Sequence, residues 1–376
     1  MNSFEVNKGD LNAEKHRWAH FLQANMQHIE MMNINVYDSR KSSWAQNNVE
    51  FAAALDTPAP YLQEFTLIMG DNTKGIESLF SGTAPLLHRA SISTNQQFHL
   101  SHFTSLKVLK LKISVHFHAQ LLAMVPALLE LEELDLFGSV DCSHATVPDA
   151  SETRVVLLPS CRSLALKRMG SPLASYLLSS MSVSKLERLS VHEKLLPKDG
   201  VLEASFLQAL ALIAVQSTGA ATLQLALQRN HLFVKASGTP VFAYSVDCSY
   251  LEKRCHFDEA EQLLEIAVPI FTMLSTNLSM QPKELVIELC QHAPASPLYM
   301  MDQSLLWRRV FAEYDHVEVL RLSGDTAEVI EVLNSSDSYF PLLSEVQFTE
   351  GTLVASSDLE ILLDISRERA FSVSVY

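Results

Sequence analysis

Two short stretches hold the side chains best suited to chemistry. His116 and His118 flank a single residue, so on a strand both imidazoles would point to one face, as the ligands of a metal ion do. Cys142 and His144 place a thiol and a base two positions apart. No Cys or acidic residue accompanies the histidine pair at a matching spacing, and catalytic dyads are normally assembled from distant segments. We therefore expect surface histidines, a loop cysteine and no metal site.

Motifs of the common enzyme classes are absent from the sequence. The chain contains no GxSxG, GxxxxGK[ST], GxGxxG or HExxH segment. We predict no catalytic residues, no cofactor and no enzymatic activity. One alternative stays open, namely an enzyme built on residues 193–284, where the sequence pattern is least regular.

A mixed set of charged and aromatic side chains is the better candidate for function. Each member alternates with apolar residues in a predicted strand and should therefore point away from the core. Aromatic and Arg side chains are also preferred in the hot spots of protein interfaces. A solvated strand face without any ligand would have the same pattern. The candidate partner-binding residues are Lys110, Lys112, Asp135, Phe137, Lys167, Arg188, His192 and Arg321.

The predicted strands that carry these candidate residues share a recurring sequence signature. It consists of an apolar residue, two variable ones, an apolar residue, one variable residue and a last apolar residue. Its central positions are 65, 90, 109, 134, 164 and 189, with successive spacings of 25, 19, 25, 30 and 25 residues. Later copies are centred at 320 and 346, and a weaker copy covers Met31–Val36. Such spacing is typical of leucine-rich repeats, which each supply one strand and a returning helix.

Segments with helical spacing lie between these strands. They are His118–Leu131, Ser171–Met181, Asp302–Tyr314 with Asp302 as a candidate N-cap, and Asp358–Ile365 before a last strand, Phe371–Val375. Residues 193–284 break the rhythm. This region has long helical runs at Ser205–Val215 and Asp258–Leu274 and strands at Thr222–Leu227 and Val241–Val246. We interpret it as lengthened or degenerate repeats, with a separate inserted domain as the alternative.

The predicted fold is α/β, an irregular leucine-rich-repeat solenoid. In this horseshoe, parallel strands line the concave face and helices the convex face. Residues 1–30 are predicted as an N-terminal helical cap, because Glu14–His28 has the spacing of an amphipathic helix. Residues 31–376 are predicted as the solenoid, irregular at 193–284.

Composition narrows the environment and the partners. The formal net charge of −15 repels phosphate backbones, so we expect no nucleic-acid partner. The five cysteines are widely spaced without a CxxC pair, which favours a reducing compartment over a disulfide framework. The N-terminus lacks the apolar core of a secretory signal, and no window approaches 18 uninterrupted apolar residues. The prediction is a cytoplasmic or nuclear protein, not secreted and without a membrane partner.

With this pattern in view, the sequence resembles the F-box and leucine-rich-repeat-like proteins that are expanded in mushroom-forming fungi. The resemblance covers most of residues 25–370. It is carried by segments that in this family lead into successive repeats, namely Ala59–Ile68, Leu79–Ile92, Phe103–Leu111, Leu121–Leu136 and Leu157–Leu166.

The resemblance implies a substrate receptor of a ubiquitin ligase, in which an N-terminal F-box binds a Skp-type adaptor. That F-box is not visible here, because its Leu-Pro entry is missing and the first thirty residues contain no Pro. A Skp-type adaptor is therefore not a predicted partner. We expect a protein-recognition scaffold for a protein of unknown identity, either lacking its F-box or working without the ligase. The remaining alternative is a structural or degenerate family member with no dedicated partner.

Overall fold

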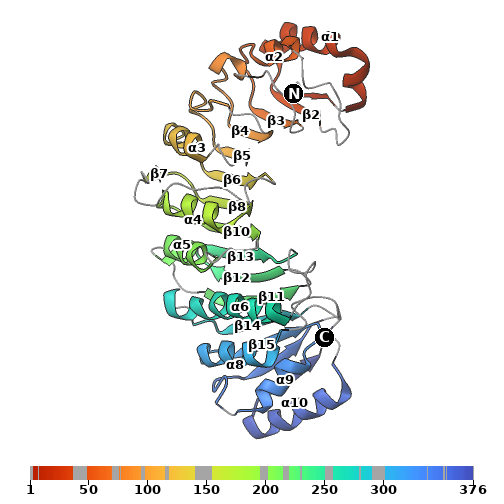
Figure 1. The fold of residues 1–376 in the computed structure, drawn as a ribbon, viewed down its shortest axis with the longest axis vertical. Helices are drawn as coiled ribbons and strands as arrows, with labels where there is room; N and C mark the ends of the chain where they lie inside the picture. Colours follow the sequence, from red (N-terminus) through yellow and green to blue (C-terminus); the bar gives the residue numbers. More distant parts are fainter. Residues whose placement is uncertain are drawn as a thin grey trace. The chain divides into compact units, whose positions relative to one another are not determined.

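The computed structural model divides the chain into two compact units. Unit 1 comprises Met1–Met169 and Ser179–Leu186, and unit 2 comprises Gly170–Leu178 and Glu187–Tyr376. Each unit is an α/β structure with a mostly parallel sheet (Figure 1). The structure describes residues 3–6, 8–36, 49–69, 76, 78–94, 98–114, 118–139, 155–194, 202–214, 220–228, 231–249, 257–278, 281–289, 301–336, 338–349, 352 and 354–375.

The strands of unit 1 follow one another through the sheet in nearly the order of the sequence. The order is β1-β2-β3-β4-β5-β6-β8, and β7 and β9 form a small second sheet; every described pair is parallel. The strands are β1 Ser3–Val6, β2 Met31–Val36, β3 Glu64–Met69, β4 Arg89–Ser93, β5 Val108–Ile113, β6 Glu133–Gly138, β7 Val156–Leu158, β8 Ser163–Met169 and β9 Met181–Val183. The helices are α1 Lys8–Asn25, α2 Val49–Leu55 and α3 His118–Met124, with 3-10 turns η1 Met26–His28, η2 Phe80–Gly82 and η3 Val125–Ala127.

Unit 2 interrupts its parallel sheet with an antiparallel segment. Its order is β10-β13-β12-β11-β14-β15-β16-β17, in which β12 runs antiparallel to both of its neighbours. The strands are β10 Arg188–Lys194, β11 Ala220–Gln228, β12 His231–Gly238, β13 Val241–Asp247, β14 Glu284–Leu289, β15 Val319–Ser323, β16 Glu345–Phe348 and β17 Ser372–Val375. The helices are α5 Leu202–Ala214, α6 Phe257–Leu278, α8 Gln303–Glu313, α9 Ala327–Asn334 and α10 Ser356–Arg369, and α4 Ser171–Ser179 lies mostly in this unit.

Alternating burial along the strands builds the core of each unit. The apolar members of the repeat signature, such as Leu109 and Leu111 of β5, are buried, and the residues between them are not. In unit 2, helices α5, α6, α8, α9 and α10 pack successively against one another along the buried face of the sheet (Figure 1). Aromatic side chains fill this layer: the ring centroids of Phe311 and Phe340 are 4.6 Å apart, and Trp307 is fully buried. In each unit the repeated apolar residues thus make an apolar layer between strands and helices.

Several predicted elements are confirmed. Asp302 caps α8, because its Oδ1 accepts a hydrogen bond from the Leu305 N–H at 2.9 Å. The helical runs of the irregular region are α5 and α6, its two strands lie within β11 and β13, and the last strand is β17. The coarse prediction of an α/β chain with a mostly parallel sheet is therefore confirmed.

Other elements differ from the sequence-based expectation, and the prediction of parallel strands throughout is wrong at β12. Only residues 229–230 and 239–240 separate β12 from its neighbours in sequence. A parallel crossover needs a dozen residues or more, so these connections force antiparallel pairs. Residues 193–284 join the sheet of unit 2 by pairing with β10 and β14, rather than forming a sheet of their own.

Two further differences concern unit 1. The predicted helix from His118 ends at Met124, because Pro126 lacks the N–H that would continue the helical ladder. At the N-terminus, strand β1 precedes α1 and pairs in parallel with β2, so residues 1–30 contain a strand as well as a helix. On α1 itself, Leu22 is buried but Phe21 is 45% exposed.

Candidate functional site

The predicted partner-binding residues all lie on strands and alternate with buried side chains. In β5, Lys110 and Lys112 alternate with the buried Leu109 and Leu111, and the same alternation holds for the others. They therefore point away from the helices. We call this side of each sheet the open face. Five of the predicted residues lie in unit 1, and three, Arg188, His192 and Arg321, lie in unit 2.

The five residues of unit 1 are neighbours on β5, β6 and β8. The strand register places Lys110 beside Asp135, and Phe137 between Lys112 and Lys167. The Nζ of Lys167 lies 2.7 Å from Oδ2 of Asp135. The prediction that these residues share one face is therefore confirmed. Because both members of the ion pair are partly exposed, it contributes only about 0.2–1 kcal/mol to stability.

A sixth residue, Arg168, joins this group although the sequence does not single it out. Its Cζ lies 5.2 Å from the centroid of the Phe137 ring, within cation–π range. The backbone of Arg168 has a φ of 54°, which breaks the alternation of β8. As a result Arg168 is exposed and Met169 takes the buried position. Together the six residues form the unit 1 cluster: Lys110, Lys112, Asp135, Phe137, Lys167 and Arg168.

In unit 2, Arg321 is held within a network across four strands, β11, β14, β15 and β16. Its Nε lies 2.7 Å from Oε1 of Glu284 and donates to Oε1 of Gln347 at 2.8 Å. Glu284 also accepts a hydrogen bond from the Thr222 hydroxyl at 2.8 Å. Arg321 is thus committed to neighbours on its own sheet, which favours a positioning role over direct contact with a partner.

His192 belongs to a second group on the same sheet. Its Nδ1 lies 2.6 Å from Oγ of Ser245, and its ring centroid lies 5.7 Å from that of His231. The register places His231 directly opposite Asp247. Burial alone would raise the pKa of Asp247, but hydrogen bonds from Ser249 and the two nearby imidazoles lower it below its ordinary value. Asp247 therefore stays ionised beside the histidines.

The contact between Ser245 and His192 resembles half of a hydrolase site, but the strand that carries Ser245 commits its backbone donors to the sheet. Strand β13 is paired on both sides, with β10 and with β12, so backbone amides here are committed to the sheet ladders. A nucleophilic serine also needs donors that stabilise an oxyanion, usually backbone N–H groups. A paired strand does not supply them.

A buried polar group lies on the opposite side of β10, beneath the helices. Glu193 is fully buried, and its Oε2 accepts a hydrogen bond from the Ser171 hydroxyl at 2.6 Å. The hydroxyls of Ser205 and Tyr244 lie 3.4 Å apart beside it. Burial, and then the negative charge of Glu193, raise the pKa of Tyr244 well above its ordinary value. This group joins α4 and α5 to the sheet and is closed to solvent, so we assign it a structural role.

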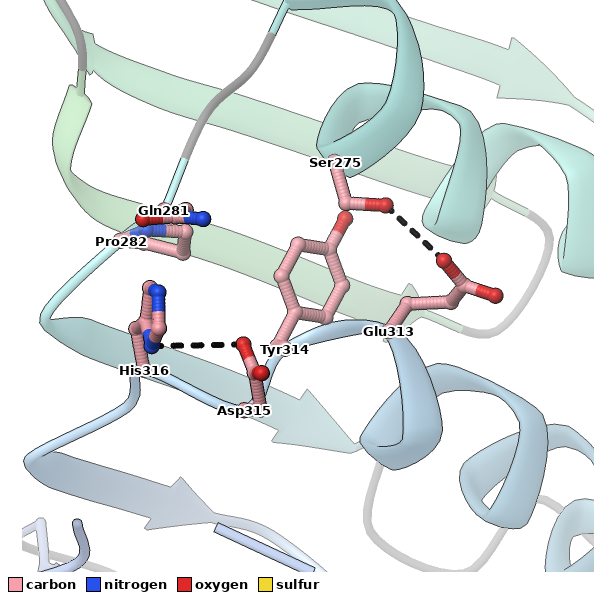
Figure 2. A pocket seen from close by; sticks show the side chains of 7 residues that line it. All are labelled: Ser275, Gln281, Pro282, Glu313, Tyr314, Asp315 and His316. Carbon is pink, nitrogen blue, oxygen red and sulfur yellow. Dashed lines mark hydrogen bonds and ion pairs between the residues drawn. The ribbon is translucent and has the colours of Figure 1, made fainter. Parts of the chain in front are cut away.

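One pocket lies near the ends of α6 and α8 (Figure 2). Its volume is about 230 Å³, below the 300–1,000 Å³ of typical small-molecule sites. Figure 2 shows Ser275 and Glu313 on one side of Tyr314, and Asp315 with His316 on the other. These groups satisfy one another: Ser275 donates to Glu313 at 3.1 Å, and His316 Nδ1 lies 3.4 Å from Asp315 Oδ1. Burial raises the pKa of Tyr314 far above neutrality, so its hydroxyl stays protonated.

The remaining candidates for chemistry have little support. His116, Cys142 and His144 lie outside the described residues, and His118 begins α3 rather than lying on a strand. Cys161 and Cys248 are free and buried; burial raises their pKa to about 11 and about 12. Within the described ranges, no three His, Cys, Asp or Glu side chains are placed to hold a metal ion. None of the helices in those ranges is both long and apolar enough to span a bilayer.

Sequence reasoning missed the open-face residues of β12. His231, Phe233 and Lys235 alternate there with the buried Leu232 and Val234. The signal was available, because the segment HLFVKASG has the two-residue period of a half-buried strand. It lies between two strands that were predicted.

The comparisons with known proteins add no identification. The chain matches no protein-family model, and a search of curated proteins finds no match either.

Proposed function

We propose that this chain is a non-enzymatic protein-recognition scaffold, a leucine-rich-repeat-like solenoid that acts in the cytoplasm or nucleus. Its resemblance to the F-box and leucine-rich-repeat-like proteins suggests a substrate-receptor-type member of that family. The partner is a protein, and neither nucleic acid nor a membrane is expected to bind.

The observation that carries the proposal is the unit 1 cluster. Lys167 and Asp135 hold each other at 2.7 Å, and Arg168 stands over the ring of Phe137. Side chains that are already ordered lose less conformational entropy when a partner binds. Arg and aromatic side chains are also enriched in binding hot spots. The cluster thus combines the residue types and the preorganisation that an interface needs.

The alternative is a structural family member without a dedicated partner. It is favoured by the same ion pair, because Lys167 and Asp135 satisfy each other and would suit a solvated strand face equally well. The two proposals differ in what happens when the cluster is removed. A scaffold loses its partner, whereas a partner-free protein loses nothing.

The test is affinity capture from a native extract of the source organism, read by mass spectrometry. The full chain is compared with the double variant Lys110→Ala and Phe137→Ala. The matched control is Leu129→Ala with Glu130→Ala, which removes one exposed apolar and one exposed charged side chain from the turn before β6. A protein captured by the wild type and by the control, but lost in the cluster variant, supports the scaffold. Identical captures by all three forms contradict it.

A further inference from the structure

We infer that a second surface, on the open face of unit 2, binds an extended peptide segment rich in Asp and Glu. This inference rests on the proposed function and names the chemistry of one partner segment. The surface consists of side chains on the two strands that flank β13. We call it the hairpin patch: Arg188, His192 and Lys194 on β10, and His231, Phe233 and Lys235 on β12.

The register of three strands brings these residues together although they come from distant parts of the chain. On β13 the open-face side chains are Val241, Ala243, Ser245 and Asp247, most of them short. The pairing places His192 beside Ser245, and Ser245 beside Phe233. The longer side chains of the hairpin patch thus stand on both sides of a central strand with small ones. The rings of the two histidines lie 5.7 Å apart across it.

Charge is the second element of the argument. The hairpin patch holds three permanent cations, Arg188, Lys194 and Lys235, and two imidazoles. Asp247 is the acidic residue on the open face of these three strands. Among the described residues, neither Lys194 nor Lys235 has an ion-pair partner within 4 Å. On a protein with a net charge of −15, such a patch is a local exception.

The rest of the same face has the opposite character. On β14 and β16 it carries Glu284, Glu288 and Glu345, and Arg321 on β15 between them is bound to Glu284. We therefore expect an acidic partner to contact β10, β13 and β12 and not to extend beyond β11. This boundary argues against a long nucleic acid, which would have to cross the glutamates.

Spacing argues for a peptide rather than a small anion. From Arg188 to Lys194 the strand extends about 20 Å, and from β10 to β12 the sheet extends about 10 Å. No small anion reaches such distant cations together. An extended peptide places every second side chain about 6.6 Å apart, which is also the spacing of alternate residues on β10 and β12. On β10 the alternate open-face residues are Arg188, Ser190, His192 and Lys194, so the two permanent cations stand at the ends of the strand with an imidazole between them. Carboxylates at alternate positions of a peptide can thus face these three residues, while Phe233 on β12 offers an apolar contact.

The experiment uses the purified full chain and fluorescently labelled peptides of about eight residues, long enough to extend along β10. In the first peptide Glu alternates with Ser; in the second, Gln replaces Glu. Fluorescence polarisation measures affinity at about 50 mM and about 300 mM salt, because the higher concentration screens exposed charges more strongly. We expect the Glu peptide to bind more tightly than the Gln peptide and to weaken at high salt.

Two double variants locate the site. Lys194→Ala with Lys235→Ala removes two cations from the hairpin patch, and we expect affinity for the Glu peptide to fall about fivefold or more. Arg308→Ala with Arg309→Ala removes two exposed cations from α8, and we expect no change. Lys194 and Lys235 are half-buried, Arg308 and Arg309 are exposed, and none of the four belongs to the core, so neither variant should unfold the chain; circular dichroism checks this.

Three outcomes would overturn the inference. These are equal binding of the Glu and Gln peptides, an equal loss in both double variants, and tighter binding of a labelled oligothymidine than of the Glu peptide. Absence of peptide binding also overturns it, but leaves the proposed function intact if extract capture still depends on Lys110 and Phe137. Conversely, if the peptide binds at the hairpin patch but extract capture does not depend on Lys110 and Phe137, the peptide site is supported and the unit 1 cluster is not a binding surface.

Discussion

Replacing Gly138 by Ala should loosen the strands that carry the unit 1 cluster. A Cβ at this position would lie 2.4 Å from the backbone oxygen of Arg168 on the neighbouring strand. An ordinary carbon–oxygen contact is about 3.3 Å, so β6 and β8 must move apart by about 0.9 Å. The clashing atom belongs to the backbone, held by the left-handed φ of Arg168, and cannot turn aside.

The size of the effect follows from this overlap. Overpacking of this kind costs about 1–3 kcal/mol, and at about 2 kcal/mol local opening becomes roughly thirtyfold more frequent. Hydrogen exchange read by mass spectrometry measures this opening in peptides that cover 133–138 and 163–169. We expect faster exchange there and unchanged exchange in unit 2.

The control is Phe137→Ala, which removes the ring beneath Arg168 without adding an atom. Loss of an exposed cation–π contact costs about 0.5–1 kcal/mol, so exchange should rise by no more than about fivefold. Wild-type exchange in Gly138→Ala would refute the reasoning, because it would mean that the two strands do not approach as closely as 2.4 Å implies.

The remaining predictions concern thiols, a helix cap and an ion pair. Because burial raises the pKa of Cys161 to about 11 and that of Cys248 to about 12, both thiols stay protonated at pH 8 and should resist iodoacetamide in the native chain. Asp302→Ala removes the acceptor of the first turn of α8 and should cost about 1 kcal/mol. Lys167→Ala should change stability by less than about 1 kcal/mol, because its pair with Asp135 is partly exposed.

Each of these has a direct measurement. Mass spectrometry after alkylation compares native and urea-unfolded chain, and equal labelling of both would contradict the buried thiols. Hydrogen exchange in residues 303–313 measures how the loss of the cap affects α8. If Asp302→Ala exchanges there as slowly as the wild type, the predicted contribution of the cap is wrong. Thermal denaturation of Lys167→Ala beside Arg309→Ala tests the ion pair. A much larger loss of stability in Lys167→Ala than in Arg309→Ala would contradict the small contribution expected of the pair.

Much of the fold was predictable because the spacing of apolar residues in the sequence indicates which side chains are buried. Leu109, Leu111, Leu134 and Leu136 predicted β5 and β6, and both strands bury those residues. Strand direction was harder, because parallel and antiparallel strands share a period of two residues. The short connections around β12 did contain that information, since they cannot hold a crossover.

The candidate site was predictable only one strand at a time. Alternation placed Lys110, Asp135 and Phe137 on one side, and the register confirmed that they are neighbours. Arg168 could not be found this way, because a left-handed residue in β8 reverses the alternation locally. The hairpin patch needed the pairing of β10 with β13, which are separated in sequence by α5, β11 and β12.

The antiparallel segment of unit 2 also bears on how that unit folds. Strands β11, β12 and β13 are joined by short connections and can pair soon after synthesis, whereas His192 and Ser245 are 53 residues apart, and Thr222 and Glu284 are 62. Pairs between distant residues form late, because the intervening chain must first be ordered. We expect this three-stranded meander to be the nucleus onto which β10 and β14 add from opposite sides. The described strand pairs of unit 1 are all parallel, so among those strands there is no antiparallel meander from which the sheet could start.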